Sequence, residues 1–427
     1  MYKKCKDFVK SVLPKPVWII VKTVAKAILF CVASFYMWCL NLRQPTKITT
    51  LYTTRIGHLA INTDCFIRMQ RAKHSNQRTI FIASLPIVND FLVEKWSSIV
   101  EVITYKDKHY LFYERLRKCL AFFDSRYVFE LPYSGTEYEV YQNTENVFYF
   151  TKEEKQEGDR ILQEMGIGQN DWFVCIFARD SAYLDKTYGE FDEITGGKAW
   201  AHHDYRDSDI DSLNLAIDEI LARGGFVVRL GKIVEKAMSY KHARVIDYPL
   251  TQWRSDFMDI YLQYRAKFVL SSSTSGATDV VSLFGTHYCG ANMPANWNPP
   301  YKNSIWIPKT YSHNGTMVSF RQWIRLAEEK KAHYFYGGDY EITSTSMFSA
   351  EFYTTNQLRI IDNTPEEILD LTKEMFERLD GSFTQTDEDK KLQALYAEIN
   401  DTYLPARANK NPIGRDFLRK NKWFLEN

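Results

Sequence analysis

The segment 268–294 constrains the fold of this chain more than any other. An apolar run at 266–270 predicts a buried strand, and a second apolar run at 277–284, which ends before Gly285, predicts a helix. The turn between them holds four hydroxyl residues and a glycine: Ser272, Ser273, Thr274, Ser275 and Gly276. Backbone N–H groups at such a helix start attract anions, and a glycine lets a phosphate come close. An ordinary turn with a serine N-cap shows the same pattern, so both interpretations stay open here.

The composition is that of a globular protein long enough for two domains. The 427 residues are 45% hydrophobic and 25% charged, and the formal net charge is +1. This balance gives no support for nucleic-acid binding through bulk charge. The seven cysteines form no CxxC pair, which favours a reducing compartment over a disulfide framework or a zinc site.

The N-terminal segment 1–45 is basic and then apolar. Lysines are frequent up to Lys15, and the apolar segment 17–40 follows, in which 27–40 carries no charge. This uncharged part is shorter than the roughly 20 residues that cross a bilayer, so we expect a helix lying in or dipping into the cytoplasmic leaflet, with its lysines on anionic lipid. A single membrane span, a cleaved signal peptide and a helix docked on the protein itself are the alternatives.

The first half, 46–165, begins with a strand, a turn and a helix, as in a Rossmann-like sheet. The β-rich run 47–54 is followed by Arg55, Gly57 and His58, and then by an apolar-periodic helix at 59–69. A single glycine is not a dinucleotide fingerprint. Further strands are expected at 79–83, 99–104 and 127–130, with helices at 90–96, 109–122 and 151–165. His58 is a candidate general base, although its position alone favours a histidine that only hydrogen-bonds and orders the turn.

The second half, 166–380, predicts a second doubly wound sheet. Strands begin near Phe173, Phe226, Val245 and Phe268, with helices between most of them. Polar, charged or glycine residues follow these strands at the edge where α/β sheets bind ligands. They are Arg179 and Asp180 after the first strand, Arg229 and Gly231 after the second, and Asn292 after a strand near 288–289.

Two features of this half resemble metal sites but have simpler interpretations. The acids of Asp207-Ser208-Asp209 lie just before a predicted helix at 210–222, where they cap and complement its N-terminus. In the long polar loop 184–204, which also holds Trp200, the adjacent His202 and His203 would point to opposite faces of a strand, so we expect no shared metal. The acidic start at 364–367 predicts a helix to about 379, and a helical tail covers 381–427.

Five motifs in a fixed order carry a resemblance to a known family. They are RIGHLAINTDCFIR (55–68), FVCIFARDSAYL (173–184), YRDSDIDSLNLAI (205–217), GGFVVRLG (224–231) and SSSTSGATDVVSLFG (271–285). Together they resemble a bacterial glycosyltransferase family of surface-polysaccharide (O-antigen and capsule) gene clusters, of the GT-B type. The resemblance covers about 48–380 and implies an α/β fold with two Rossmann-like doubly wound domains facing a cleft: an acceptor domain at 46–165 and a nucleotide-sugar domain at 166–380.

The resemblance also implies the roles of the candidate residues. The donor diphosphate would be held by Arg179, Arg229, Gly231, Ser273, Thr274, Ser275, Gly276 and Asn292. The acceptor would approach Arg55 and Gly57, and its hydroxyl would be deprotonated by His58, Asp64 or Asp180 before direct displacement at the anomeric carbon. No metal or other cofactor is expected, because protein cations and a helix terminus stabilise the leaving group.

The partners implied are a nucleotide-sugar donor, a lipid-linked glycan acceptor and the anionic cytoplasmic face of the bacterial inner membrane, with no nucleic acid. Two other functions stay open at this point. One is a sugar-nucleotide epimerase of the GT-B type, and the other is a non-catalytic, membrane-tethered scaffold with the same fold.

Overall fold

The structure is a computed structural model that describes residues 15–123, 125–131, 137–189, 201–295, 299–329, 349–403 and 410–426. Contacts between residues divide the chain into two units, which are Met1–Thr54 with Gln70–Leu131, and Arg55–Met69 with Pro132–Asn427. The segment 55–69, expected in the first half, therefore belongs by its contacts to the second unit. The acceptor and donor domains at 46–165 and 166–380, and the cleft between them, stay predictions.

The first unit contains a parallel sheet in the order β1 (Thr46–Thr50), β2 (Arg78–Ala83), β3 (Glu101–Thr104). The helices α4 (Asp90–Ile99) and α5 (Tyr110–Phe122) follow β2 and β3, close to where the sequence predicts them. The expected strand at 127–130 is only a single parallel bridge between Val128 and Ile48. This unit therefore contains a three-stranded parallel sheet where the sequence predicted a full doubly wound one.

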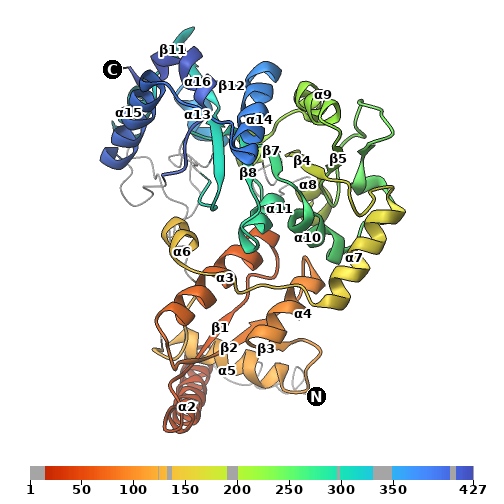
Figure 1. Cartoon of the computed structure of the whole chain (residues 1–427). Coiled ribbons are helices and arrows are strands. Elements are labelled where there is room, and N and C mark those ends of the chain that lie inside the picture. Colours follow the sequence, from red (N-terminus) through yellow and green to blue (C-terminus); the bar gives the residue numbers. More distant parts are fainter. Residues whose placement is uncertain are drawn as a thin grey trace. The chain divides into compact units, whose positions relative to one another are not determined.

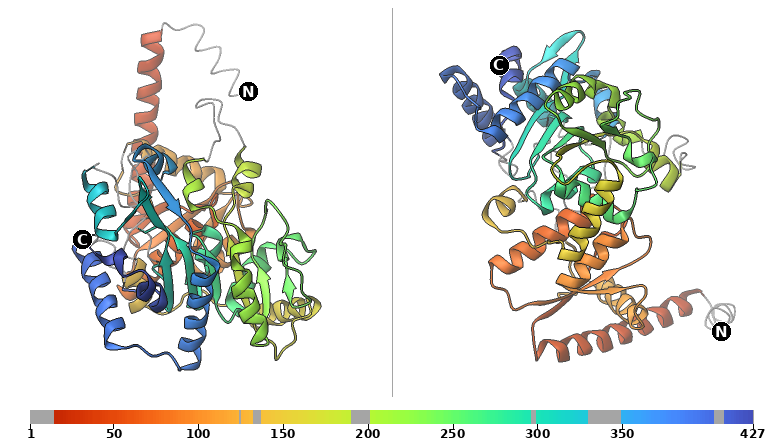
Figure 2. Two further views of the ribbon diagram at one scale, coloured as in Figure 1. Left: turned by 90° about the horizontal axis from the view of Figure 1, so that it is seen from above. Right: turned by 45° about the vertical axis from the view of Figure 1, so that its right-hand side comes forward.

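The helix α2 (Lys15–Asn41) precedes this sheet and packs on it through its C-terminal half (Figure 2). Ala33 and Met37 are buried in the core cluster that also contains Ile48 and Leu120. This half of the helix thus fits the alternative of docking on the protein itself, and the expected place of the helix in the cytoplasmic leaflet stays a prediction. Within the described chain, α2 contains the one helical segment, Ile19–Asn41, that is long and apolar enough to cross a membrane, a test that a core helix or a signal sequence also passes.

The second unit is built on a six-stranded parallel sheet in the order β6-β5-β4-β7-β8-β9. Its strands are β4 (Phe173–Ala178), β5 (Phe226–Arg229), β6 (Val245–Ile246), β7 (Val269–Ser272), β8 (Tyr288–Met293) and β9 (Ser304–Pro308). Renumbered along the chain this is the order 3-2-1-4-5-6 of a doubly wound dinucleotide-binding sheet. The sequence located these strands well because β4 and β7 are buried on both faces and read as continuous apolar runs.

Helices cover both faces of this sheet (Figure 1). The helices α9 (Asn214–Ala222) and α14 (Pro365–Asp380) pack on each other on one face, and α10 (Asp256–Arg265) contacts β4 on the other. The helix α7 (Lys152–Glu164) packs closely on α10, because a Cβ on Gly158 would lie 2.2 Å from the Tyr261 ring. Capping boxes at Thr151 and Thr364 start α7 and α14, as the sequence predicts.

The remaining elements surround this core. A small antiparallel sheet has the order β11 (Thr316–Val318), β10 (Thr310–His313), β12 (Leu358–Ile361). The helical tail of α15 (Asp387–Tyr403), α16 (Arg415–Lys420) and η6 (Lys422–Leu425) packs against α14 and on itself. The other helices are α3 (Ile56–Ala72), α6 (Glu137–Asn143), α8 (Ala182–Tyr188), η1 (Ala201–Arg206), η2 (Ile210–Leu213), η3 (Tyr248–Leu250), α11 (Gly276–Asp279), η4 (Val280–Leu283), α12 (Phe320–Glu329) and α13 (Ala350–Thr355).

Candidate functional site

The strand order of the large sheet reverses between β4 and β7, and this defines where a ligand is expected. In open α/β sheets ligands bind outside the carboxyl ends of the strands at such a switch point. The last residues of the two strands, Ala178 and Ser272, are paired in the register. Arg179 and Ser273, both predicted to bind the donor, come next in the chain and so lie together at this point.

The serine-rich bend after β7 uses its hydroxyl groups to hold a neighbouring segment. Ser271, Ser272 and Ser273 are buried, and the Ser273 hydroxyl donates to the carbonyl of Arg206, while the Ser208 hydroxyl donates to the carbonyl of Ser272. Ser273 has a φ of 129°, a backbone conformation that is rare outside glycine and that these bonds maintain. The bend therefore fixes residues 206–208 across the edge of the sheet.

The helix after this bend is shorter than the sequence predicts. Only α11 is α-helical, and the 3₁₀ turn η4 continues it to Leu283. Ser275 is the N-cap and accepts a hydrogen bond from the N–H of Ala277 at 3.2 Å. A single α-helical turn has a much weaker macrodipole than a long helix, because the dipole is a sum over aligned peptide units.

A glycine is required at position 276 for a structural reason that the sequence did not reveal. A Cβ on Gly276 would lie 2.9 Å from the backbone N of Gly57, and a Cβ on Gly57 would lie 2.7 Å from Cα of Gly276. The two glycines let the starts of α3 and α11 touch backbone to backbone. This corrects the expectation that the missing Cβ of Gly276 makes room for a phosphate.

A cluster of buried cations lies beside the bend. Nη1 of Arg179 donates to the carbonyl of His203 at 3.2 Å and pairs with Asp207, whereas its buried Nη2 has no hydrogen-bond partner among the described residues. The buried Nε of Arg206 lacks such a partner in the same part of the structure. Burial lowers the pKa of Arg179 to about 9, and the positive charge of Arg206 adds to this effect. Although Asp207, Asp204 and Asp180 act on the charge of Arg179, the cluster therefore holds buried N–H donors that lack hydrogen-bond acceptors in the described chain.

Lys309 extends this cluster. It follows β9, is 2% exposed, and its Nζ lies 2.8 Å from Oδ1 of Asp362 and 2.8 Å from the carbonyl of Asp207. Burial lowers the pKa of Lys309, with Asp362 opposing and Arg179 adding to the effect. Neither Arg206 nor Lys309 was among the predicted site residues, although Lys309 directly follows β9 at the ligand-binding edge and the strand-end rule applies to it.

His58 lies on the first turn of α3, which begins at Ile56 and not at residue 59 as predicted. Its Nδ1 lies 3.3 Å from Oδ1 of Asn62. Because that oxygen is an acceptor, Nδ1 carries the proton in this arrangement and the basic lone pair is on Nε2. Burial lowers the pKa of His58 to about 3, and the charges of Arg55 and Arg206 contribute, so the imidazole is neutral at physiological pH. His58, Arg55 and Arg206 thus belong to one electrostatic neighbourhood.

Asp64 lies elsewhere. Both Asp64 and Arg68 are buried, and their Oδ2 and Nε atoms are 2.7 Å apart. Arg68 also donates to Oδ1 of Asn146 at 2.9 Å. This ion pair holds α3 against the 144–146 segment, so the structure argues against the predicted role of Asp64 as a catalytic base.

Arg229, Asp180 and Gly231 also have structural surroundings. Nη1 of Arg229 donates to the Lys236 carbonyl at 2.8 Å and lies 3.2 Å from Oδ1 of Asp247. Oδ2 of Asp180 lies 3.9 Å from Nη2 of Arg229 and accepts the N–H of Glu235 at 3.1 Å. Gly231 has a φ of 150° in the same loop. These three residues stabilise the loop that leads to β6, and their predicted contact with the donor diphosphate stays a prediction.

Asn292 lies within β8, not after it, and has a φ of 52°. Its Nδ2 donates to Oγ of Ser272 at 2.8 Å, and its backbone N–H donates to Oδ1 of Asn363 at 2.6 Å. The N–H of Asn363 returns a bond to Oδ1 of Asn292 at 2.5 Å. This reciprocal pair joins β8 to the residue before α14. Through its bond to Ser272, Asn292 thus holds the end of β7, where the bend begins.

Of the two acids at 207–209, Asp209 caps a helix as the sequence predicts, whereas Asp207 pairs with Arg179. The side chain of Asp209 caps η2 by accepting the N–H of Asp211. Among the residues that the structure describes, no group of three or more His, Cys, Asp or Glu side chains is placed to hold a metal ion. That the chain needs no metal stays a prediction, and Trp200, the loop 190–200 and the side chain of His202 lie outside the described residues.

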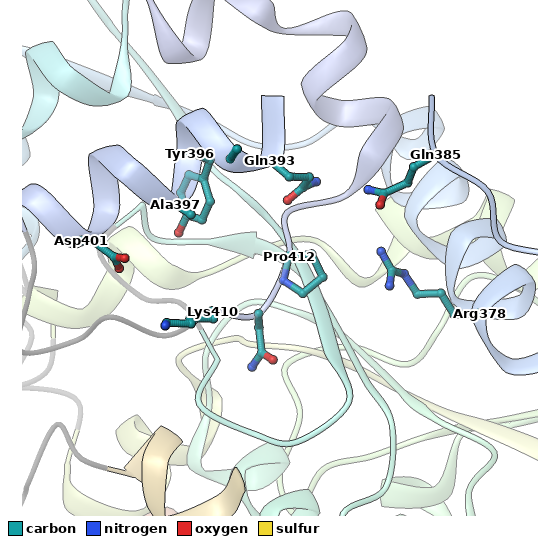
Figure 3. A pocket seen from close by; sticks show the side chains of 10 residues that line it. Arg378, Gln385, Gln393, Tyr396, Ala397, Asp401, Lys410 and Pro412 are labelled. Atoms are coloured by element: carbon teal, nitrogen blue, oxygen red, sulfur yellow. The ribbon is translucent and has the colours of Figure 1, made fainter. Parts of the chain in front are cut away.

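A cavity of about 400 Å³ lies between the ends of α14 and α15 and the segment 410–412 (Figure 3). Arg378, Gln393, Tyr396 and Asn411 are among the residues that line it. None of the candidate site residues contributes to its walls, so this cavity does not mark the candidate site.

Comparison with known proteins gives only weak likeness. No family model and no curated protein matches the chain. A solved glycosyl transferase of family 9 from Veillonella parvula DSM 2008 has 10% identity and a TM-score of 0.37, with 62% of this chain and 86% of that one covered. The dodecameric, iron-containing heptosyltransferase TibC, solved in complex with ADP-D-beta-D-heptose, has 10% identity and a TM-score of 0.34 over 79% of this chain and 77% of its own.

The spinosyn forosaminyltransferase SpnP has 10% identity and a TM-score of 0.26, with 83% of this chain and 99% of that one covered. Scores of this size carry no argument about fold or activity. The functional conclusion below therefore depends on the residues of the site.

Proposed function

We propose that the chain is a glycosyltransferase that moves a sugar from a nucleotide-sugar donor to a glycan acceptor in surface-polysaccharide synthesis. The observation that carries the proposal is the incompletely paired guanidinium cluster at the switch point of a doubly wound sheet. Nη2 of Arg179 and Nε of Arg206 are buried donors that lack hydrogen-bond partners in the described chain, next to the bend after β7. A diphosphate supplies the charge and the acceptor oxygens that such donors require.

In this proposal the bend after β7 acts mainly by positioning. Ser273 holds the backbone of Arg206 and Ser208 holds that of Ser272, so the hydroxyl groups fix the segment that carries the cations. Arg179 and Arg206 then neutralise the negative charge that develops on the nucleoside diphosphate as it leaves.

His58 is the proposed general base. The acceptor hydroxyl oxygen would attack the anomeric carbon, the bond from that carbon to the diphosphate oxygen would break, and Nε2 of His58 would take the hydroxyl proton. With a pKa near 3, the imidazole by itself is a weak base. A bound diphosphate would offset the charges of Arg55 and Arg206 and raise the pKa of His58, so that base and donor become competent together.

We further propose that the chain works at the cytoplasmic face of the bacterial inner membrane on a lipid-linked acceptor. The apolar helix α2 and the lysine-rich residues before it support this location. Lipid-linked glycans lie at that surface, so a membrane-bound enzyme would meet its acceptor there.

The proposal is tested by binding UDP, GDP, ADP and dTDP to the full chain and to the variant R206Q. We expect at least one of these nucleoside diphosphates to bind, with about tenfold or greater loss in R206Q, because a charge-assisted hydrogen bond is worth about 1.5–3 kcal/mol. Isothermal titration calorimetry gives the affinities.

The matched control is R244Q. Arg244 donates to the carbonyls of Gly225 and Leu221 and directly precedes β6. It therefore lies at the amino ends of the strands, whereas the candidate site lies at their carboxyl ends. It should keep its nucleotide affinity. Slow release of sugar from the matching nucleotide sugar without acceptor would support a transferase. Interconversion of free nucleotide sugars would support an epimerase. Nucleotide binding without any turnover would support a scaffold. Failure of all four nucleotides to bind would refute the proposal.

A further inference from the structure

The outward face of α2 is apolar, although no described residue of its unit covers it. The inner face packs on the first unit through Phe30, Ala33, Tyr36, Met37 and Leu40. On the opposite side of the helix, the exposed fractions of Val24, Ile28, Val32, Phe35 and Trp38 are 52, 60, 62, 64 and 48%. A helix on a protein surface normally presents polar residues there, so a helix that is apolar all round requires an apolar environment on its second side.

The helix α5 extends this apolar surface. The Tyr36 and Phe112 rings meet edge to face at 5.3 Å, and the Phe30 and Phe123 rings lie 4.6 Å apart, so α2 and α5 pack side by side in the first unit. Leu111 and Phe122 of α5 are 61% and 62% exposed and fall on one helical stripe. The apolar surface therefore spans two helices that are fixed to one another.

Cations accompany this surface. Arg115 and Lys118 are exposed on the same stripe of α5, between Leu111 and Phe122. Nζ of Lys26 lies 3.7 Å from the centre of the Phe122 ring. In the sequence, Lys3, Lys4, Lys6 and Lys10 precede α2, which begins at Lys15. Apolar side chains bordered by lysine and arginine match the boundary between headgroups and acyl chains of an anionic bilayer.

The docked half of α2 also limits how the helix can enter a membrane. Residues 30–40 are held on the core of the first unit, which leaves Lys15–Leu29 of the described helix to project. At 1.5 Å per residue this part is roughly 22 Å long, less than the roughly 30 Å of a hydrocarbon core.

We propose that the outward face of α2 and the stripe Leu111–Phe122 of α5 form one membrane-docking surface that enters a single leaflet of an anionic bilayer and does not cross it. The inference rests on the membrane location proposed above and is independent of glycosyl transfer. A second copy of this chain on the same face is the competing occupant, and the experiment distinguishes the two.

Two native cysteines report the topology of the full chain. Cys31 is exposed on α2, and Cys5 lies in the lysine-rich segment before it. The protein is added to preformed vesicles of phosphatidylcholine with phosphatidylglycerol and treated with a membrane-impermeant maleimide, and each cysteine peptide is quantified by mass spectrometry. We expect vesicles to protect Cys31 at least fivefold and to leave Cys5 as reactive as it is after detergent. Protection of Cys5 until detergent is added would mean a span, and concentration-dependent protection of Cys31 without lipid would mean self-association; either result overturns the proposal.

The role of α5 is tested separately by the double variant L111S/F122S. Both side chains are mostly exposed, so the fold should be retained, and partition to the same vesicles should weaken about tenfold or more. The control L250S changes an equally exposed leucine (59%) of the second unit and should bind as the parent does. Equal vesicle binding by all three proteins would refute the part assigned to α5. Nucleotide binding by these variants without vesicles should be unchanged, which separates this outcome from failure of the proposed activity.

Discussion

Arg179 directly follows β4 and Arg229 is the last residue of the neighbouring strand β5, and both were predicted to bind the donor diphosphate. In the structure, Arg229 is 2% exposed and its guanidinium contacts the Lys236 carbonyl, Asp247 and Asp180. Arg179 is 6% exposed, yet its buried Nη2 lacks a hydrogen-bond partner in the described chain, and Arg206 adds a second positive charge nearby. Arg179 follows β4 at the switch point, whereas Arg229 ends β5, one strand away, so the strand order separates a candidate ligand residue from a structural one.

The largest effect expected from this comparison is on stability at Arg229. R229Q should lower the free energy of unfolding by about 3–5 kcal/mol, because it removes one partner of a buried charge pair and leaves Asp247 uncompensated. Urea denaturation followed by tryptophan fluorescence measures the change. The control K232Q breaks the half-exposed pair of Lys232 and Asp256 and should cost less than about 1 kcal/mol. Similar losses in both variants would contradict the buried network.

Arg179 should show the opposite balance. R179Q should weaken nucleoside diphosphate binding about tenfold to a hundredfold, equivalent to about 1.4–2.8 kcal/mol, since it removes a charge-assisted donor. The unfolding free energy of R179Q should fall by less than that of R229Q. Asp207, which loses its partner, is 30% exposed and can be solvated, and the repulsion between the charges of Arg179 and Arg206 is removed. Calorimetry and urea denaturation on the same samples measure both quantities. A variant that is unstable but binds normally would reverse the two assignments.

The third expected effect concerns the contribution of His58 to stability and depends on pH. Its pKa in the folded chain is about 3, below its usual 6.5, so its neutral form is favoured in the folded state. The stability from this preference is present above pH 6.5 and is lost as the pH falls toward 3, with a slope of up to about 1.4 kcal/mol per pH unit. H58Q should therefore lose less stability than the parent between pH 6.5 and 4.5. Parallel curves of unfolding free energy against pH would contradict the positive surroundings of His58.

The sequence predicted the large sheet well and the first unit less well. Buried parallel strands such as β4 read as apolar runs, and capping boxes at Thr151 and Thr364 are local signals. The bridge at Val128 depends on tertiary pairing with Ile48, which no local pattern encodes. That 55–69 and 132–427 belong to one unit likewise follows from contacts between residues far apart in sequence.

The candidate site was predictable by position but not by partner. The strand-end rule found Arg179 and the serine bend, yet it could not show that Gly276 is needed to contact Gly57 or that Asp64 pairs with Arg68. Arg206 is the last residue of the short 3₁₀ helix η1, where neither the strand-end rule nor α-helical periodicity applies. Its place is set by the hydroxyl of Ser273, 67 residues away in sequence.

The seating of Met37 in the core of the first unit bears on how this protein can be handled in water. Removing residues 1–41 to improve solubility would expose Ile48 and Leu120 to water. The truncated chain would then carry a new apolar surface in place of the one removed. Removing only residues 1–28 would delete the projecting turns of α2 and keep its docked half, with Ala33 and Met37, on the core of the first unit.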